Sequence, residues 1–216
     1  MSRPRYRDIA RLASTVAGRQ ALYRTMRAPG HHGGQQLAAV IAVSLVPAVV
    51  ALASVEHWGL ASLGAALAAV FQGMSIVYFG HRYPMHHVWR GLEIVHEMHT
   101  RYHHMMFDEG QTEIASLDDV DMVMFPARHA LGLCAVVVPL LALPWLLGLG
   151  LDAALAHAGV AWLYYLAYEL VHLAAHGPIG GPLDRVPGLG WLLRHHRRHH
   201  AWSLMHHGNF SMLIPL

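Results

Sequence analysis

Residues 37–79 read LAAVIAVSLVPAVVALASVEHWGLASLGAALAAVFQGMSIVYF, which is two long apolar runs joined by the short connector Glu56–Gly59. Each run has about the 20 residues that a helix needs to cross the hydrocarbon core of a bilayer. A second pair of such runs follows later in the chain, joined by Gly150–Asp152. The sequence therefore predicts an all-α integral membrane protein with four transmembrane helices, at 37–55, 60–79, 130–149 and 153–171.

The composition is that of a membrane protein with little charge. Of the 216 residues, 55% are hydrophobic and 13% are charged, whereas about 25% of residues are charged in soluble domains. All 15 basic residues are arginine and the net charge is only +2, so the basic patch of a nucleic-acid-binding protein is not expected. The single cysteine, Cys134, excludes an intrachain disulfide framework. We expect one membrane-embedded domain over 37–216, preceded by a basic segment at 1–36.

The positions of the arginines predict which ends of the helices face the cytoplasm. Seven arginines precede the first apolar run, four lie between the second and third, four follow the fourth, and the two short connectors have none. Because arginine is enriched in cytoplasmic loops, all three arginine-bearing regions are predicted to be cytoplasmic. The absence of lysine, with abundant Ala, Leu and Arg, is typical of a GC-rich bacterial genome and favours the bacterial inner membrane.

Two interpretations of the basic segment 1–36 remain open. Apolar residues alternate with arginines between Arg3 and Met26. This pattern fits an interfacial helix that lies on anionic headgroups. It fits equally a basic tail that only sets the topology.

Most of the 20 histidines fall in four clusters: HRYPMHH at 81–87, HEMHTRYHH at 96–104, HLAAH at 172–176 and HHRRHH at 195–200. The first cluster follows the second apolar run, and the third cluster follows the fourth run. On the predicted topology, all four clusters therefore lie at the same cytoplasmic interface. We expect them to form a helical, histidine-rich cap on the transmembrane helices.

The spacing within each cluster is typical of metal ligands. At 3.6 residues per turn, His96, His99 and His103 lie near one face of a helix, with His104 beside them. His172 and His176 form an i,i+4 pair that can hold one ion. In the last cluster, His196, His199 and His200 share a face. His81 and His86 would diverge on a regular helix, but Pro84 between them predicts a kink that could turn both inward.

The predicted metal ligands are His81, His86, His96, His99, His103, His104, His172, His176, His196, His199 and His200. Imidazole binds iron, zinc and copper well, and so many ligands suit two ions rather than one. A lone histidine pair is usually a coincidence, and 195–200 alone could be a basic surface patch. Four clusters on one membrane face make coincidence a poor explanation.

Other residues near the clusters have two interpretations. Glu93, Glu97 and Glu169 could orient imidazoles from outside, or could serve as helix caps. His87 and His195 could support the ligands or lie at the interface, and the same is open for His129, His206 and His207. The remaining histidines, His31, His32, His57 and His157, are interpreted as bystanders.

Over about residues 75–216 the chain resembles the fatty acid hydroxylase superfamily, which includes sterol desaturases, sterol methyl oxidases and fatty acid 2-hydroxylases. His81-x₄-His86, His96 through His104, His172-x₃-His176 and His196-x₂-His199-His200 look like the four histidine boxes of that family. The tail Asn209-Phe210-Ser211 with Pro215-Leu216 is similar to its closing segment. In the second box, His99 stands four residues before the final pair, where the family commonly has three, so the choice between His96 and His99 stays open. Family members also usually continue beyond the Pro-Leu position, so we expect an incomplete C-terminal cap.

The resemblance implies a membrane di-iron enzyme that hydroxylates or desaturates a lipid-like substrate with O₂. It implies two iron ions, for which zinc could substitute in a purified sample, and an external electron carrier such as a cytochrome b₅-like or ferredoxin-like protein. The acidic residues Asp108, Glu109, Glu113, Asp118, Asp119 and Asp121 could dock that carrier or form a solvated loop. A carotenoid-type ring hydroxylase and a non-enzymatic metal-binding membrane protein remain as alternatives.

Overall fold

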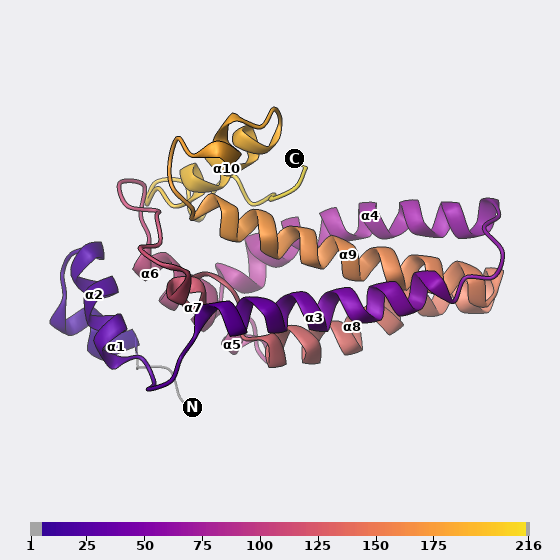
Figure 1. Cartoon of the computed structure of the whole chain (residues 1–216), viewed down its shortest axis with the longest axis horizontal. Helices are drawn as coiled ribbons and strands as arrows, with labels where there is room; N and C mark the ends of the chain where they lie inside the picture. Colours follow the sequence, from indigo (N-terminus) through magenta and orange to yellow (C-terminus); the bar gives the residue numbers. More distant parts are fainter. Residues whose placement is uncertain (1–5, 215–216) are drawn as a thin grey trace. The chain divides into compact units, whose positions relative to one another are not determined.

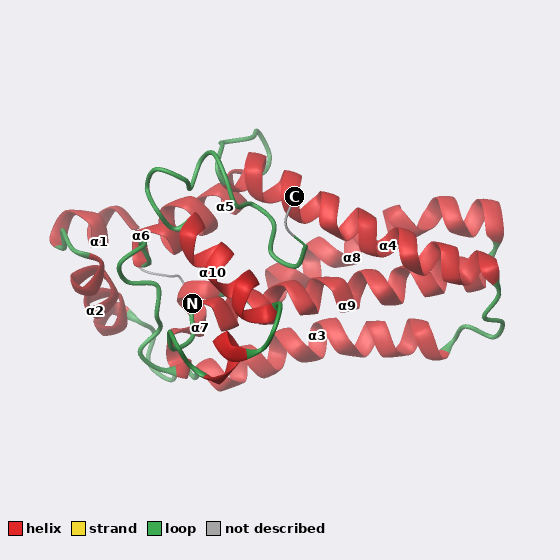
Figure 2. Cartoon of the chain, turned by 90° about the horizontal axis from the view of Figure 1, so that it is seen from above, coloured by secondary structure: helices red, strands yellow, loops and turns green. Residues whose placement is uncertain are grey.

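The structure is a computed structural model that describes residues 6–214. All regular elements in this part of the chain are helices, as the sequence predicts (Figures 1 and 2). The chain divides into two compact units. One, here called the span unit, comprises 35–76 and 125–170; the other, the histidine unit, comprises 77–124 and 171–214 together with the residues up to 34.

Three helices are long and apolar enough to cross a membrane, which indicates a membrane protein. They are α3 (Gly33–Ala53), α4 (Leu60–Gly80) with its continuation to Met85, and α8 (Ala127–Leu149). Only 22%, 17% and 22% of their apolar stretches are buried by the rest of the protein. The remaining apolar surface is suited to lipid.

The fourth predicted span falls in α9 (Leu151–Ala175), a helix of 25 residues. α9 carries Asp152, His157 and Glu169, which makes it more polar than the other three long helices. The four-span topology and the cytoplasmic position of the histidine clusters therefore stay predictions. α8 is continuous through Pro139 and Pro144.

The span unit is held together by small apolar contacts. Ala48, Cys134, Val138 and Trp162 form a buried cluster, in which Cys134 is a small core residue. At the helix ends, the carboxylate of Asp152 accepts hydrogen bonds from the backbone N–H groups of Glu56 (3.0 Å) and His57 (3.1 Å). The start of α9 is thereby bonded to the connector between α3 and α4.

The histidine unit consists of short helices and loops. It contains α1 (Tyr6–Leu12), α2 (Val16–Met26), α5 (Glu93–His96), α6 (His104–Met106), α7 (Val120–Val123) and α10 (Leu189–His199). Two segments are π-helical, η1 (His81–Met85) and η2 (Glu97–His103), and two are short 3₁₀ turns, η3 (Leu117–Asp119) and η4 (Pro182–Arg185).

The N-terminal helices belong to the protein core rather than to a free basic tail. Ile9, Val16 and Tyr23 are buried, so the inward face of α1 and α2 packs within the histidine unit. Gly33, at the start of α3, passes so close to Leu117 that a Cβ there would lie 1.9 Å from the Leu117 carbonyl oxygen. This contact requires glycine.

Candidate metal centre

Nine buried histidines form two groups in the histidine unit that could hold metal ions. The first group is His81, His86, His99, His104 and His199. The second group is His103, His172, His176 and His196. Within each group the candidate ligand nitrogens lie within 4.8 Å of one another. Imidazoles from four separate stretches of the chain thus converge, as the spacing predicts.

The π-helical segments explain how the first two clusters contribute to the first group. His81 and His86, like His99 and His104, are five residues apart. Five residues turn an α-helix by about 140° beyond one full turn, so such pairs would diverge. A π-helix closes i→i+5 hydrogen bonds and returns the fifth residue close to the starting face. The kink expected at Pro84 is therefore a π-helical turn, and both histidines point inward as predicted.

The last two clusters complete the two groups. His172 and His176, one turn apart at the end of α9, both belong to the second group. α10 supplies His196 to the second group and His199 to the first. His200 belongs to neither group, but its Nε2 lies 3.2 Å from that of His196. Its ring centroid lies 4.4 Å from that of His104.

The distances between ligand atoms fit a metal coordination sphere. Nε2–Nε2 separations are 2.9 Å for His81–His99 and His86–His199, and 3.2 Å for His99–His104. In the second group they are 3.1 Å for His103–His172 and 3.3 Å for His176–His196. Two nitrogens bound to one ion at 2.0–2.1 Å are about 2.9–3.4 Å apart for angles from octahedral to tetrahedral.

Hydrogen bonds at Nδ1 fix the tautomers of five imidazole rings. The Nδ1–H groups donate to backbone carbonyls, from His81 to Phe210, His103 to Met122, His176 to Thr112, His199 to Gly208 and His200 to Phe107, at 2.6–3.3 Å. A carbonyl oxygen can only accept, so the Nε2 of each ring is unprotonated. Such outer hydrogen bonds are typical of metal-binding histidines.

This arrangement leaves lone pairs that a cation would satisfy. In the first group, His81 and His199 both direct unprotonated Nε2 atoms inward, and their ring centroids are 4.4 Å apart. In the second group the same holds for His103 and His176, at 4.8 Å. A hydrogen bond from His99 can satisfy one such lone pair, whereas a cation bound by the whole group satisfies its inward lone pairs together. The residues therefore fit metal binding.

Burial keeps these imidazoles neutral. Loss of solvent, reinforced by the neighbouring imidazoles, lowers the pKa of His99, His104 and His196 well below the ordinary value of 6.5. The same causes lower the pKa of His199 and His200. Neutral imidazole is the form that binds a metal ion.

The closing segment 208–210 holds two ligands of the first group. Gly208 and Phe210 provide the carbonyls for His199 and His81. Asn209 between them has φ 60° and is the one non-glycine residue with positive φ in the described part of the chain. Its Nδ2 donates to the carbonyl of His195 (3.2 Å). Pro215 and Leu216 lie outside the described residues.

Several predicted site residues lie outside both groups. His96 is partly exposed, so the structure places His99 rather than His96 among the candidate ligands. Glu93 is exposed and accepts a hydrogen bond from the Gly91 N–H (2.9 Å), which is a capping role. Glu97 is half-buried, and Glu169 is buried in the span unit, where it accepts a hydrogen bond from the Tyr165 hydroxyl (2.6 Å).

The remaining histidines have peripheral positions. His87, His206 and His207 are exposed, although the His206 ring lies 5.3 Å from that of His86. His195 and His129 are half-buried. The predicted bystanders His31, His32, His57 and His157 are absent from both groups.

Two acidic residues were assigned wrongly from the sequence. Asp119 and Asp121 were expected in a docking surface or a solvated loop, but both are buried and paired with arginines of α2. Their partners are more than 90 positions away in the chain, which no local pattern indicates.

Sequence reasoning did not identify the groups that hydrogen-bond to the outer nitrogens of the histidines. The carbonyls of Thr112 and Met122 are backbone atoms, and any residue type can supply them. The hydroxyl of Thr100, which donates to the Met85 carbonyl (2.5 Å) and lies 3.4 Å from His86 Nδ1, is a side chain that could have been noticed.

No family model, no curated protein and no solved structure matches this chain. The interpretation of the site therefore depends on its geometry and chemistry.

Proposed function

We propose that this protein is a membrane enzyme that uses two histidine-bound iron ions and O₂ to oxidise a lipid-like substrate. The observation that carries the proposal is the pair of adjacent, fully buried imidazole groups, supplied by four separate stretches of the chain. The ring centroids of His99 in the first group and His103 in the second are 5.2 Å apart. Two ions bound in the two groups would therefore be neighbours.

The chemistry proposed for the bound ions is oxidation of an unactivated C–H bond. An alkyl chain offers no acidic proton and no leaving group, so a redox cofactor must supply the reactivity. For hydroxylation, one atom of O₂ enters the C–H bond as a hydroxyl group, and the other leaves as water after uptake of two electrons and two protons. The electrons come from a separate carrier protein.

The chain's own residues would bind and orient the ions and keep water away. Five imidazoles are held by backbone carbonyls, which fixes both the tautomer and the ring direction. Iron is preferred in the proposal because C–H oxidation requires a redox-active metal. An all-imidazole site also binds zinc, so zinc in a purified sample would not contradict it.

The apolar helices support a lipid-like substrate. Three helices with largely uncovered apolar surface are long and apolar enough to span a bilayer, where an apolar substrate would be concentrated. The choice among an acyl chain, a sterol and a carotenoid-type ring is left to product analysis.

The test combines metal content with turnover. The protein, purified in detergent and loaded with iron(II) without air, should bind two irons per chain and consume O₂ when given a reductant and a lipid panel. Mass spectrometry should detect a product with one added oxygen, or with two hydrogens lost. His176→Ala should abolish turnover, whereas His96→Ala, outside both groups, should retain it. Two bound irons with no oxidised product from any lipid class would contradict the proposal.

A further inference from the structure

Helix α2 is hydrogen-bonded to the end of α6. Arg19 Nε donates to the carbonyl of Met105, and Gln20 Nε2 donates to the carbonyl of Met106, both at 2.7 Å. Gln20 is buried and lies 86 positions from Met106 in the chain. These hydrogen bonds fix the backbone at the end of α6.

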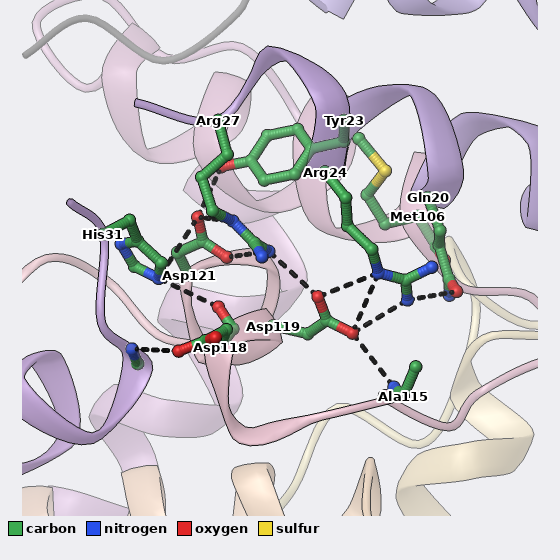
Figure 3. A network of polar contacts seen from close by, with 11 residues as sticks. Gln20, Tyr23, Arg24, Arg27, His31, Met106, Ala115, Asp118, Asp119 and Asp121 are labelled. Atoms are coloured by element: carbon green, nitrogen blue, oxygen red, sulfur yellow. Dashed lines mark hydrogen bonds and ion pairs between the residues drawn. The ribbon is translucent and has the colours of Figure 1, made fainter. Parts of the chain in front are cut away.

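One turn further along α2, two arginines hold the segment from η3 to α7 (Figure 3). Arg24 contacts both carboxylate oxygens of Asp119, through Nε (3.0 Å) and Nη2 (2.8 Å). Arg27 bridges Asp119 (2.9 Å) and Asp121 (2.8 and 3.0 Å). The Tyr23 hydroxyl donates to the same Asp121 carboxylate (3.1 Å).

The charges of this network are matched within the protein. Asp119 is 0% exposed, and a buried carboxylate is costly unless it is paired and hydrogen-bonded. Burial opposes ionisation of Asp119, but hydrogen bonds from Arg24 and Arg27 outweigh it and lower its pKa. Removal of one arginine would therefore leave a buried carboxylate without a full set of partners.

One attachment of α2 is one residue away from a carbonyl that orients a ligand of the second group. Met122 follows Asp121, and its carbonyl accepts the Nδ1–H of His103 (3.0 Å). The attachment at Met106 instead precedes Phe107, whose carbonyl accepts the Nδ1–H of His200, a residue outside both groups. The carbonyls that orient the first group belong to 208–210. The contact of Arg27 with Asp121 is thus linked to the second group, whereas the contacts of Arg19 and Gln20 lie beside His104 of the first group.

We propose that α2, through Arg24 and Arg27, is a positioning element for the second histidine group, so that weakening this contact releases one metal ion selectively. This inference rests on the proposed function only in that both groups bind a metal. It gives the basic N-terminal segment a role inside the protein, beyond setting topology or lying on headgroups.

The experiment measures the affinity of each group for zinc(II), which needs no redox control. Zinc per chain is determined for the full-length protein in detergent against a competing chelator of known affinity. In Arg27→Gln and in Asp121→Asn, one zinc should bind 10- to 100-fold more weakly, the usual cost of disturbing an outer partner of a ligand, which here is the Met122 carbonyl that orients His103. The other zinc should be unaffected. Arg11→Gln, a matched change at an exposed residue of α1, should leave both unchanged.

Combination with ligand deletions shows which group responds. In a protein with His86→Ala and His199→Ala, the remaining zinc belongs to the second group, and adding Arg27→Gln should weaken it 10- to 100-fold. In a protein with His172→Ala and His176→Ala, the remaining zinc belongs to the first group, and Arg27→Gln should not change its affinity.

The outcomes separate the two proposals. A wild-type protein that binds no metal would contradict the proposed function and this inference together. Two zinc ions with unchanged affinities in Arg27→Gln, or equal weakening of both, would overturn the role of α2 alone. If Arg27→Gln does not fold, Arg27→Lys, which keeps the charge but not the fork of donors, should show a smaller loss confined to the second group. Equal loss from both groups in Arg27→Lys would again overturn it.

Discussion

The Nε2 atoms of His86 and His199 lie 2.9 Å apart although the residues are 113 positions apart in the chain. The Nδ1–H of His199 donates to the Gly208 carbonyl, so its Nε2 is an acceptor. The Thr100 hydroxyl donates to the Met85 carbonyl and is left to accept from His86 Nδ1. Two acceptor nitrogens at this distance are best explained by a shared cation.

Deletion of one member of this pair should therefore remove metal. We expect His86→Ala to lose at least one of two bound ions, measured as metal per chain by elemental analysis. His96→Ala is the matched control in the neighbouring cluster, because His96 is partly exposed and outside both groups. A His86→Ala protein with full metal content would show that the first group is not a binding site.

Acidification should destabilise the metal-free protein. The pKa values of His104, His196 and His200 are lowered in the folded state, whereas the unfolded chain protonates near the ordinary value of 6.5. Below that value the unfolded state binds more protons, so the free energy of unfolding falls as the pH falls. Thermal unfolding in detergent should show a lower midpoint at pH 5.5 than at pH 7.5 (about two units apart around the histidine pKa). A midpoint independent of pH would contradict burial of neutral imidazoles.

Asn209 should be sensitive to its backbone conformation. Its φ of 60° costs an ordinary L-residue about 1–2 kcal/mol, whereas glycine and asparagine adopt it more easily. We expect Asn209→Ala to lower the free energy of unfolding by about that amount and to weaken metal binding. Asn209→Gly removes only the side-chain hydrogen bond to His195, so it should be milder in both measurements. If both variants lose the same stability and metal affinity, the side-chain hydrogen bond of Asn209, and not its backbone conformation, is the important feature.

The close approach of Gly33 to η3, both within the histidine unit, should exclude any side chain at residue 33. A Cβ there would lie 1.9 Å from the Leu117 carbonyl oxygen and 2.6 Å from Asp118 Cα, both backbone atoms. Gly33→Ala should cost about 1–3 kcal/mol, as for other overpacked sites. Gly34→Ala is the control, since its nearest neighbour would be a Leu117 methyl at 3.6 Å. Chemical denaturation of both variants in detergent compares them directly, and a stable Gly33→Ala protein would contradict this contact.

The sequence predicted the helical architecture and most of the candidate ligands. Runs such as 37–55 are long and apolar enough to predict a membrane-spanning helix. Pairs at i,i+4, such as His172 and His176, lie on one face of any α-helix. These features depend on local periodicity. Periodicity is the information that a single sequence carries most directly.

The division of histidines into two groups could not be predicted in the same way. His99, His103 and His104 share a cluster, yet His103 belongs to the second group and the other two to the first. That outcome follows from the π-helical turn in η2, and a regular α-helical projection does not contain it. The same projection kept His96 as a ligand.

Polar contacts between residues far apart in the chain could not be predicted from local sequence patterns either. In the sequence, Asp119 cannot be distinguished from any other residue of an acidic loop. Only the fold brings it into contact with Arg24, which is 95 positions away. The carbonyls of Met122 and Gly208 carry no residue identity at all. Supporting contacts of this kind become visible only when the chain is folded.

The depth at which the nine imidazoles are enclosed has a kinetic consequence. None of them is more than 3% exposed, so a free ion in solution has no direct approach to the ligand atoms. Uptake and exchange then require local opening of the surrounding segments and should be slow compared with binding at a surface. The identity of the bound ion would accordingly be decided by which metal is abundant while the chain folds. After folding, a change of medium would replace the bound ion only as fast as such openings occur.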